Sequence, residues 1–520
     1  MNGAVSLLTT MEHNDVTTCF MNPGTSEMHF VAALDDVPGV RGVLCLFEGV
    51  ASGAADGFAR VTGRPAATLL HLGPGLGNAF ANLHNARRAH SPVLNIVGDH
   101  ATYHSRYDAP LTTDIASIAR GLEGWYRRSA RADDVAQDAA DAISAACGPP
   151  GRIATLVLPA DASWSEAPAF TIAHDAVRAR AGLVAHESVE EAASLLRSKR
   201  SALLLGGPAL RRDGLAAAAA IAEATGCKVL SETFPAVVDR GAGIHAAERL
   251  NYIAEFAMAQ LEGFEVLVLV GAPEPVSFFA YPDLASRIVP AGCIVIDLAP
   301  LHLDVVRGLV SLREAVGASD ASPAPMDASR PARPSGALTA ASLAAAVGSV
   351  LPEGCIVVDE ANTSGVGLPV ATQGAPPHEW LTLCGGSIGF GLPAAVGAAI
   401  GGGGRRILSI EADGSAAYTP QALWTMAREA LDVTVLCCSN DSYAILNYEL
   451  SRVGATAHGE RSKAMLDLTG PTLDLAATAR SFGVPAETVT TADELVVALD
   501  KSLATPGPTV IDAKVPSIIR

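Results

Sequence analysis

The sequence predicts an α/β protein of three domains, each a doubly wound parallel sheet. Short apolar runs rich in Val, Ile and Leu alternate with Ala-rich stretches of helical length, and many runs end in Gly, Asp or Asn. This is the pattern of parallel βα units, whose strands are buried on both faces. Hydrophobic residues make up 49% of the chain and charged residues only 17%, which favours buried strands over disorder. At 520 residues the chain is too long for one hydrophobic core.

The expected strands fall into three groups along the chain. The first third carries the runs 16–21, 42–48, 66–73, 92–99 and 154–159. The middle carries 202–207, 228–233, 266–273 and 293–300. The last third carries 355–362, 380–386, 407–414, 433–440 and 509–515.

Two changes in composition separate these groups. The segment 318–336, rich in Ala, Ser and Pro, is interpreted as an exposed linker, and a softer break lies near 163–177. We therefore expect an N-terminal domain over 1–165, a central domain over 183–317 and a C-terminal domain over 337–520. Ligands of such sheets bind at the carboxyl ends of the strands, so the residues that end each run are candidates for a site.

The overall composition excludes several classes of function. Lysine and arginine less aspartate and glutamate give 36 − 54 = −18, so a nucleic-acid partner is not expected, because phosphates require a basic face. No run of about 18 apolar residues predicts a membrane span, and the first residues do not resemble a signal peptide. Nine cysteines are scattered without a CxxC pair, which favours a reducing cytoplasm.

Two runs in the last third end in residues suited to a divalent cation. Asp413 follows the run 407–412, and Asn440 and Ser442 follow the run that starts at 433. The separation, 440 − 413 = 27 residues, fits one helix between adjacent parallel strands. A carboxylate, an amide oxygen and a backbone carbonyl would then meet at one sheet edge, and phosphate oxygens would complete the oxygen coordination that magnesium prefers. An isolated Asp-Gly more often marks a turn, so the prediction depends on the whole pattern.

This pattern resembles the motif of thiamine-diphosphate enzymes, GDG followed one helix later by NN. Ala412 replaces the first Gly and Asp441 the second Asn, and neither supplies a metal ligand in the family pattern. The resemblance implies that thiamine diphosphate binds through Mg²⁺, with Asp413, Asn440 and the Ser442 carbonyl as the metal ligands. It also implies contacts between the cofactor and Gly414, Ser415, Tyr443 and Ala444.

Glu48 is the candidate activating acid. It ends the run 42–48 and precedes a helix rich in Gly and Ala; taken alone, it would be a first-turn acid that stabilises a helix N-terminus. The segment FEGVASGAADGFARVTGRPA, however, resembles the one in thiamine-diphosphate enzymes whose Glu hydrogen-bonds the aminopyrimidine ring. In that family the Glu and the metal site come from different subunits. The resemblance therefore implies a homodimer or homotetramer with its active sites at the subunit interface.

Three further stretches carry candidate residues. Gly24 and Thr25 belong to NPGTSE after the first strand, which matches the family loop near the substrate and is otherwise a good turn. In HLGPGLGN, His71 falls where benzoylformate decarboxylase-like members carry an active-site His, and Asn78 is a candidate diphosphate contact at a helix start. In the last domain, Gly386, Ser387 and Ile388 resemble the loop under the cofactor, with Asn362 and Thr363 lining the diphosphate and pyrimidine pocket.

The resemblance covers nearly the whole chain and is closest to acetolactate synthase large-subunit-like proteins. It implies attack of a cofactor ylide on a 2-oxo acid, loss of carbon dioxide, and ligation of the resulting enamine to a second carbonyl. A 2-oxo acid decarboxylase of the benzoylformate type, which releases an aldehyde, is the alternative. A non-catalytic cofactor-binding paralogue is the third reading. A product assay with a panel of 2-oxo acids would separate them.

Several features leave the reaction open. Asp99-His100 stands where true synthases carry a Gln, and the middle domain offers Phe278 and Phe279 where the decarboxylases carry a second His. No glycine fingerprint argues for flavin adenine dinucleotide in the central domain, so FAD stays an open question. His100, His104 and Tyr443 are unranked candidates for the site, and the segment 445–465 is a candidate lid.

Overall fold

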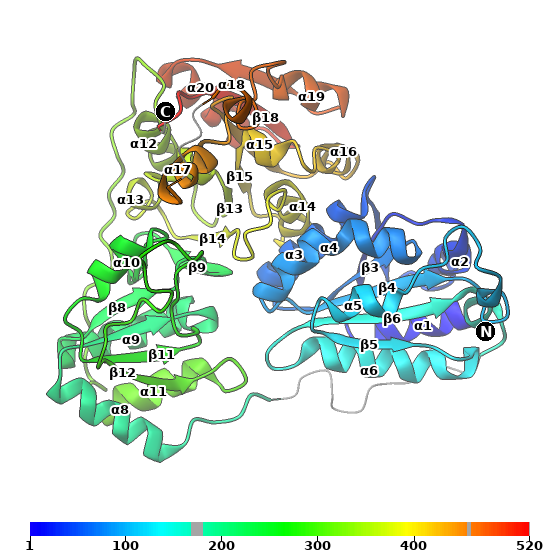
Figure 1. Ribbon diagram of the computed structural model, residues 1–520, viewed down its shortest axis with the longest axis horizontal. Helices are drawn as coiled ribbons and strands as arrows, with labels where there is room; N and C mark the ends of the chain where they lie inside the picture. Colours follow the sequence, from blue (N-terminus) through cyan, green and yellow to red (C-terminus); the bar gives the residue numbers. More distant parts are fainter. Residues whose placement is uncertain (168–179, 455–458, 519–520) are drawn as a thin grey trace.

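The computed structural model describes residues 1–167, 180–454 and 459–518 and contains three β-sheets flanked by helices (Figure 1). The three sheets confirm the predicted fold class. The predicted break near 163–177 extends into residues outside the described ranges, and so does part of the candidate lid. The domain boundaries stay predictions. Among the described residues no helix is both long and apolar enough to cross a membrane.

The first sheet has six parallel strands in the order β2-β1-β3-β4-β6-β5. Its strands are β1 (Thr18–Met21), β2 (Arg41–Leu44), β3 (Ala66–Leu70), β4 (Val93–Asp99), β5 (Trp125–Arg128) and β6 (Ile153–Pro159). Its helices are α1 (Gly3–His13), α2 (Met28–Asp36), α3 (Glu48–Thr62), α4 (Leu72–Arg88), α5 (Ile115–Arg120), α6 (Val135–Cys147) and α7 (Ala160–Trp164). Separate apolar clusters line the two faces of the sheet, as expected of a doubly wound fold.

The second sheet has the order β10-β8-β7-β11-β12. Its strands are β7 (Ser201–Leu205), β8 (Lys228–Ser231), β10 (Glu248–Arg249), β11 (Val266–Val270) and β12 (Ile294–Ala299). The helices around it are α8 (His186–Ser198), α9 (Arg212–Thr225), α10 (Ala254–Leu261) and α11 (Val305–Ala315).

The third sheet has the order β17-β18-β16-β15-β13-β14-β9. Its strands are β13 (Ile356–Glu360), β14 (His378–Thr382), β15 (Ile407–Ala412), β16 (Val433–Ser439), β17 (Ala486–Val489), β18 (Thr509–Lys514) and β9 (Val237–Arg240). Strand β9 comes from the middle of the chain and pairs antiparallel with β14, whereas the other pairs are parallel. The central part of the chain is thereby joined to the third sheet.

Within the described ranges, nine helices accompany the third sheet. They are α12 (Ala340–Val350), α13 (Leu368–Ala371), α14 (Gly391–Gly401), α15 (Asp413–Ala416), α16 (Gln421–Arg428), α17 (Ala444–Arg452), α18 (Glu460–Lys463), α19 (Leu475–Ser481) and α20 (Ala492–Ala504). The predicted linker, 318–336, has no regular secondary structure.

Helices α3 and α14 join the first and third sheets through one continuous apolar cluster (Figure 1). Their backbones are in direct contact: a Cβ added at Gly57 would lie 2.1 Å from the Ala394 carbonyl oxygen, and one at Gly397 would lie 1.8 Å from that of Ala54. Neither position has room for a side chain. Both helices begin at the same end of this contact, because Gly53 lies against Pro393 and Gly401 lies against Thr62.

Candidate functional site

The tips of β15 and β16 meet as the spacing predicts. The two strands pair in parallel up to Ala412 and Cys438. Asp413 starts the short helix α15, is only 2% exposed, and accepts backbone N–H bonds at Oδ2 from Asn440 at 2.9 Å and from Asp441 at 2.7 Å. Its Oδ1 accepts the Gly414 N–H at 2.8 Å. Burial raises the pKa of Asp413, although these three N–H groups oppose the shift.

The donor set of this loop fits a magnesium ion. Asp413 supplies a carboxylate, and Asn440, whose Oδ1 accepts the Ser442 N–H at 3.0 Å, lies beside it with an amide oxygen. No group of three or more His, Cys, Asp or Glu suited to a metal occurs among the described residues. The predicted ligand set holds a single carboxylate, so neutral oxygens and phosphate oxygens would have to complete it, as magnesium sites in phosphate-binding proteins commonly allow.

The residues next to this loop come from β13 and α17. Asn362 follows β13, has a positive φ of 49°, and donates to the Ser415 Oγ at 3.0 Å; Thr363 follows it and is half-buried. The ring of Tyr443 lies against Gly414, where an added Cβ would be 2.5 Å from the ring. A side chain at position 414 would therefore require the tyrosine ring to shift. Ala444 is buried at the start of α17.

The loop between β14 and α14 holds the predicted residues Gly386, Ser387 and Ile388. Its backbone turns sharply, with φ values of 74° at Gly386 and 91° at Gly389, a conformation that favours glycine. Ser387 and Ile388 are half-buried. The loop therefore has a fixed backbone path, and its fixation comes from residues that the sequence analysis did not identify.

Helix α4 clamps this loop. Asn85 donates to the Ser387 carbonyl oxygen at 2.8 Å and accepts the Ser387 N–H at 3.2 Å. Asn82 donates to the Gly389 carbonyl at 3.1 Å and to the Gly49 carbonyl at 2.9 Å. His84 Nε2 lies 3.1 Å from the Gly385 carbonyl oxygen. These amides lie about 300 residues from the loop in the chain, and no local motif predicts such a contact.

A buried carboxyl pair supports the same loop from the third sheet. Glu360, at the end of β13, accepts the N–H groups of Gly389 at 2.8 Å and Gly391 at 2.6 Å. Glu411, on β15, accepts the Ser409 hydroxyl at 2.5 Å. Burial raises the pKa of both carboxyl groups, and their proximity raises that of Glu411 further. The loop thus rests on two acidic side chains that the sequence analysis did not single out.

A buried arginine ties α3 to the start of this loop. Arg60 pairs with Asp56 through Nη2 at 2.6 Å, and its Nη1 donates to the Thr382 carbonyl at 2.7 Å. Its guanidinium also donates to the Cys384 Sγ at 3.3 Å and lies 4.5 Å from the centroid of the Phe390 ring. The pair is fully desolvated and multiply hydrogen-bonded, the condition under which a buried ion pair is tolerated.

Glu48 does not end a strand, contrary to the expectation. Strand β2 ends at Leu44, and Glu48 is the first residue of α3. The apolar residues 45–47 gave the appearance of a longer strand. Glu48 is 7% exposed, and its Oε2 accepts the Asn78 amide at 3.0 Å. The structure therefore brings Asn78 to Glu48, and the predicted diphosphate role of Asn78 stays a prediction.

His71 is held by an acid that the sequence analysis did not single out. Glu27 is 3% exposed, and its Oε2 lies 2.9 Å from His71 Nδ1 and accepts the Gly24 N–H at 2.7 Å. Its Oε1 accepts the Ser26 hydroxyl at 2.7 Å. Gly24 leaves room for this approach, because an added Cβ would lie 2.1 Å from His71 Nδ1 and would displace the ring. Glu27, three residues after Gly24, accepts the backbone N–H of that N-cap residue, which is the acidic half of a capping box; Gly24 has no side chain to form the other half.

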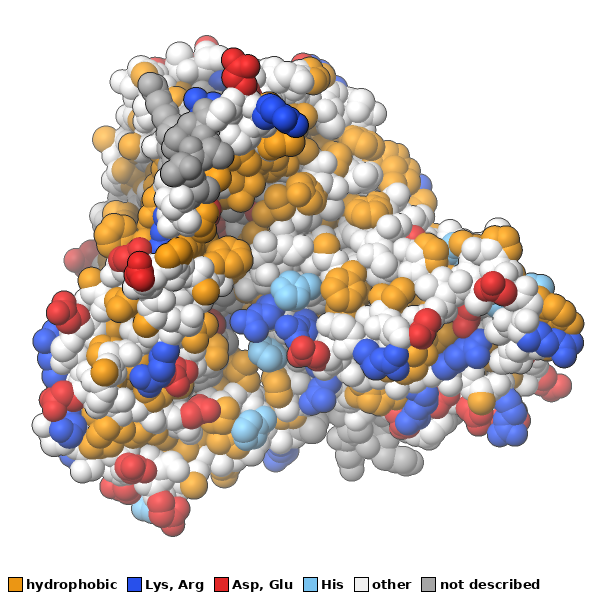
Figure 2. All heavy atoms as spheres, in the orientation of Figure 1, with side chains coloured by type: hydrophobic (Ala, Val, Ile, Leu, Met, Phe, Trp, Pro, Cys, Tyr) orange, Lys and Arg blue, Asp and Glu red, His pale blue; other side chains and the backbone are white. Residues whose placement is uncertain are grey.

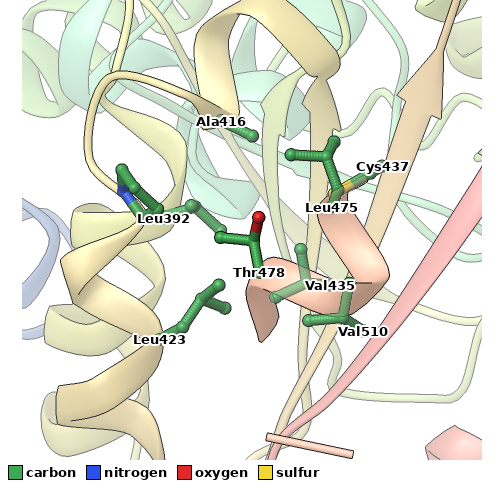
Figure 3. Close-up of a pocket in the computed structure, with 9 residues that line it drawn as sticks. Leu392, Ala416, Leu423, Val435, Cys437, Leu475, Thr478 and Val510 are labelled. Carbon is green, nitrogen blue, oxygen red and sulfur yellow. The ribbon is translucent and has the colours of Figure 1, made fainter. Parts of the chain in front are cut away.

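Within the described part of the chain, the remaining candidates form no side-chain hydrogen bond with these groups. Thr25 is exposed. The ring centroids of His100 and His104 are 5.5 Å apart with the rings tilted by 54°, and the His104 ring is tilted against that of Tyr107 at 5.6 Å. The small enclosed cavity in Figure 3 is lined by apolar residues such as Leu392, together with Thr478, and by none of the predicted site residues. It is a packing void beside β16 and β18 of the third sheet.

Comparison with known proteins places these features in a family. The thiamine pyrophosphate enzyme N-terminal TPP binding domain matches residues 1–118, and the corresponding C-terminal TPP binding domain matches residues 365–513. An acetolactate synthase large-subunit-like protein, IlvX of Mycobacterium tuberculosis, is 54% identical over 526 residues, covering 100% of both chains. A benzoylformate decarboxylase of Pseudomonas aeruginosa is 31% identical over 98% of each chain.

The solved structures agree. The thiamine diphosphate-dependent 4-hydroxybenzoylformate decarboxylase of Rhodococcus jostii RHA1 superposes with a TM-score of 0.86 at 25% identity, covering 99% of each chain. A thiamin diphosphate-dependent enzyme of Mycobacterium smegmatis superposes with a TM-score of 0.82 at 26% identity. Sequence likeness over the full length and a shared fold lead to the same assignment. The chain therefore belongs to the family of thiamine pyrophosphate enzymes.

Proposed function

We propose that this chain is a thiamine-diphosphate- and Mg²⁺-dependent enzyme that decarboxylates a 2-oxo acid and ligates the product to a second carbonyl, as in acetolactate synthases. The observation that supports the proposal most is the 2.9 Å hydrogen bond from the Asn440 N–H to Asp413, because it joins two of the residues proposed as cation ligands in a chain of this family. The full-length relative named for acetolactate synthase supports ligation.

When bound, the cofactor supplies a nucleophilic carbon and an electron sink. The chain's own residues would do the rest. Asp413, Asn440 and the Ser442 carbonyl would hold the cation, and the loop with Gly386, Ser387 and Ile388 would support the cofactor. Asn362, Thr363, Ser415 and Ala444 would line the pocket. Glu48, fixed by Asn78 at 3.0 Å, would share a proton with the aminopyrimidine ring. Because Glu48 and the cation ligands come from different subunits in the family, we propose a homodimer or homotetramer.

A second function, simple decarboxylation to an aldehyde, is favoured by a specific observation. His71 is paired with the buried Glu27 at 2.9 Å, an arrangement that orients an imidazole for proton transfer to a product carbon. Gly24 and Thr25 lie at the start of the short helical turn that contains Glu27. Benzoylformate decarboxylase likewise matches over the full length. A non-catalytic paralogue is disfavoured because Glu48, Asp413 and Asn440 are all present.

Product analysis tests these functions. Purified protein with thiamine diphosphate and Mg²⁺ is incubated separately with pyruvate and with benzoylformate. Acetolactate or acetoin supports ligation, free aldehyde supports decarboxylation, and no turnover with either 2-oxo acid contradicts both. A yellow protein with flavin absorbance would add FAD to the cofactors, and a colourless active protein would exclude it.

The nine free cysteines support a reducing, cytoplasmic location.

A further inference from the structure

Helix α17, which follows the proposed cation loop, is attached to the central part of the chain by Glu449. The Tyr252 hydroxyl donates to Glu449 Oε1 at 3.2 Å, and the Tyr281 hydroxyl donates to Oε2 at 2.8 Å. Both carboxylate oxygens are thus engaged, and the Glu449 side chain is only 16% exposed. Charge-assisted hydrogen bonds of this kind are stronger than neutral ones, particularly when they are shielded from water.

Arg452 completes the attachment on the same face of α17. It lies three residues after Glu449, a spacing that places both side chains on one helix face. Its guanidinium lies 3.7 Å from the Tyr281 ring centroid and pairs with Glu255 at 2.6 Å. Burial, together with the Glu449 carboxylate, raises the pKa of Tyr252 and Tyr281, so both hydroxyls stay protonated donors at neutral pH.

The same central segment also contacts the loop with Gly386. Phe278, three residues before Tyr281, packs against Gly386, where an added Cβ would lie 3.0 Å from the ring. The rings of Tyr252 and Phe278 are 5.3 Å apart, and those of Phe278 and Phe279 are 4.9 Å apart in an edge-to-face arrangement. Phe278 and Phe279 keep exposed fractions of 45% and 55%. Figure 2 shows one face of the molecule, on which hydrophobic side chains are exposed among charged ones.

Helix α17 is joined in turn to the cation loop. It starts directly after Tyr443, whose ring covers Gly414. Asn447, within the helix, donates to the Ser442 Oγ at 3.1 Å. Contacts therefore run from the central residues Tyr252 and Tyr281 through α17 to Ser442. The two TPP-binding family models leave residues 119–364 unmatched, so these tyrosines belong to the part of the chain that the models do not describe.

We propose that Glu449 is a positioning residue: with Tyr252 and Tyr281 it forms a clasp through which the central domain orders α17 and the Asn440–Ser442 loop. The inference rests on the proposed function, because the loop matters as the holder of Mg²⁺ and the cofactor diphosphate. Loss of the clasp is expected to weaken cofactor and substrate binding while leaving the reacting groups in place. It predicts a change in Kd and KM with kcat at saturation within about threefold of wild type.

The experiment uses the full chain and the variants Tyr252→Phe, Tyr281→Phe and Glu449→Ala. Amide hydrogen exchange of residues 444–452 without cofactor reports the clasp itself. Loss of one hydrogen bond to a charged group should speed this exchange by about tenfold or more. Equilibrium binding of thiamine diphosphate at fixed Mg²⁺, and KM for the 2-oxo acid that the product assay identifies, should weaken by about three- to tenfold in each single variant.

Two comparisons separate a positioning role from general destabilisation. Tyr126→Phe is the matched control, because Tyr126 is half-buried in β5 and its hydroxyl has no hydrogen-bond partner among the described residues; exchange at 444–452 and cofactor affinity should be unchanged. Adding Tyr281→Phe to Glu449→Ala should change the exchange rate at 444–452 and the cofactor affinity by no more than twofold, because Glu449→Ala has already removed the hydrogen bond of Tyr281.

The outcomes are distinguishable. A wild-type protein that binds no thiamine diphosphate contradicts the proposed function. Where wild type binds it, Tyr→Phe variants with wild-type exchange and affinity overturn the clasp alone. Additive effects of Glu449→Ala and Tyr281→Phe, or losses confined to kcat, overturn it as well.

Discussion

Replacing Asn85 by alanine is the sharpest test of the loop that the site depends on. Asn85 is fully buried on α4 and forms two hydrogen bonds to Ser387, through its amide at 2.8 Å and its carbonyl oxygen at 3.2 Å. In Asn85→Ala the backbone N–H and C=O of Ser387 lose their partners. Each unsatisfied group costs about 1–3 kcal/mol when buried, and Ser387 is half-buried, so we estimate a total of about 2 kcal/mol.

This loss of about 2 kcal/mol destabilises the ordered conformation of the loop relative to its disordered conformations. If only the ordered loop binds thiamine diphosphate, the apparent Kd rises in proportion to the lost population. A change of about 2 kcal/mol corresponds to a rise of up to roughly 30-fold. Asn85→Asp should be at least as damaging, because a carboxylate oxygen would face the Ser387 carbonyl.

The assay is calorimetric titration of thiamine diphosphate at saturating Mg²⁺, together with thermal unfolding. Asn95→Ala is the control: Asn95 is also fully buried, in β4 of the first sheet, and among the described residues its side chain bonds to the side chains of Thr68 at 2.8 Å and Thr155 at 3.3 Å. It should lower the unfolding temperature and leave Kd unchanged. An Asn85→Ala protein that is destabilised like the control and binds the cofactor with wild-type affinity would refute the reasoning.

Three further predictions concern single side chains. Glu48→Gln should slow hydrogen–deuterium exchange at the thiazolium C2 of bound cofactor by at least about 100-fold, and a wild-type rate measured by NMR would contradict its role. Asp413→Ala should abolish Mg²⁺-dependent cofactor binding; retained Mg²⁺-dependent affinity in a titration would place the ion elsewhere. Burial lowers the pKa of His378 from 6.5 to about 4, so the unfolded chain gains a proton first as pH falls. The free energy of unfolding should then decline between pH 6.5 and 4 by up to about 3 kcal/mol. The unfolding temperature of His378→Gln should fall less over the same pH range, and a fall identical to that of wild type would show that His378 is not the cause.

Most of the sheet strands could be predicted because their apolar runs are continuous and β-branched. The strands that the sequence analysis missed have a different pattern. Strand β5 is WYRR and half-exposed at one edge of its sheet, β17 is AETV at the edge of another, and β10 has two residues. Short edge strands carry polar side chains toward solvent, so they lack the buried-strand pattern. Strand β9 adds to a sheet built by residues more than 100 positions later, which no local pattern reveals.

The site divides in the same way. Asp413 and Asn440 could be predicted because both follow adjacent parallel strands, and register fixes their distance. Asn85 acts through Ser387, 302 residues away, and Glu27 acts through His71, 44 residues away. The sequence around Asn85 is that of an ordinary helix, whereas Glu27 also has a local partner in the Gly24 N–H. Glu48 was identified by resemblance, yet its local structure was assigned wrongly, because residues 45–47 are apolar without forming a strand. The sequence pattern was therefore enough to predict the residues at the strand ends, whereas the residues that hold the loop in place are identified only by contacts between distant parts of the chain.

The glycine contact between α3 and α14 makes the molecule's geometry hard to adjust. Glu48 begins one of these helices and the loop with Ser387 leads into the other, so the offset between acid and loop within a chain is set by main chain touching main chain. Substitutions away from this contact are not expected to change the offset between Glu48 and the loop. Substitutions at Gly57 or Gly397 should therefore shift the two helices relative to each other.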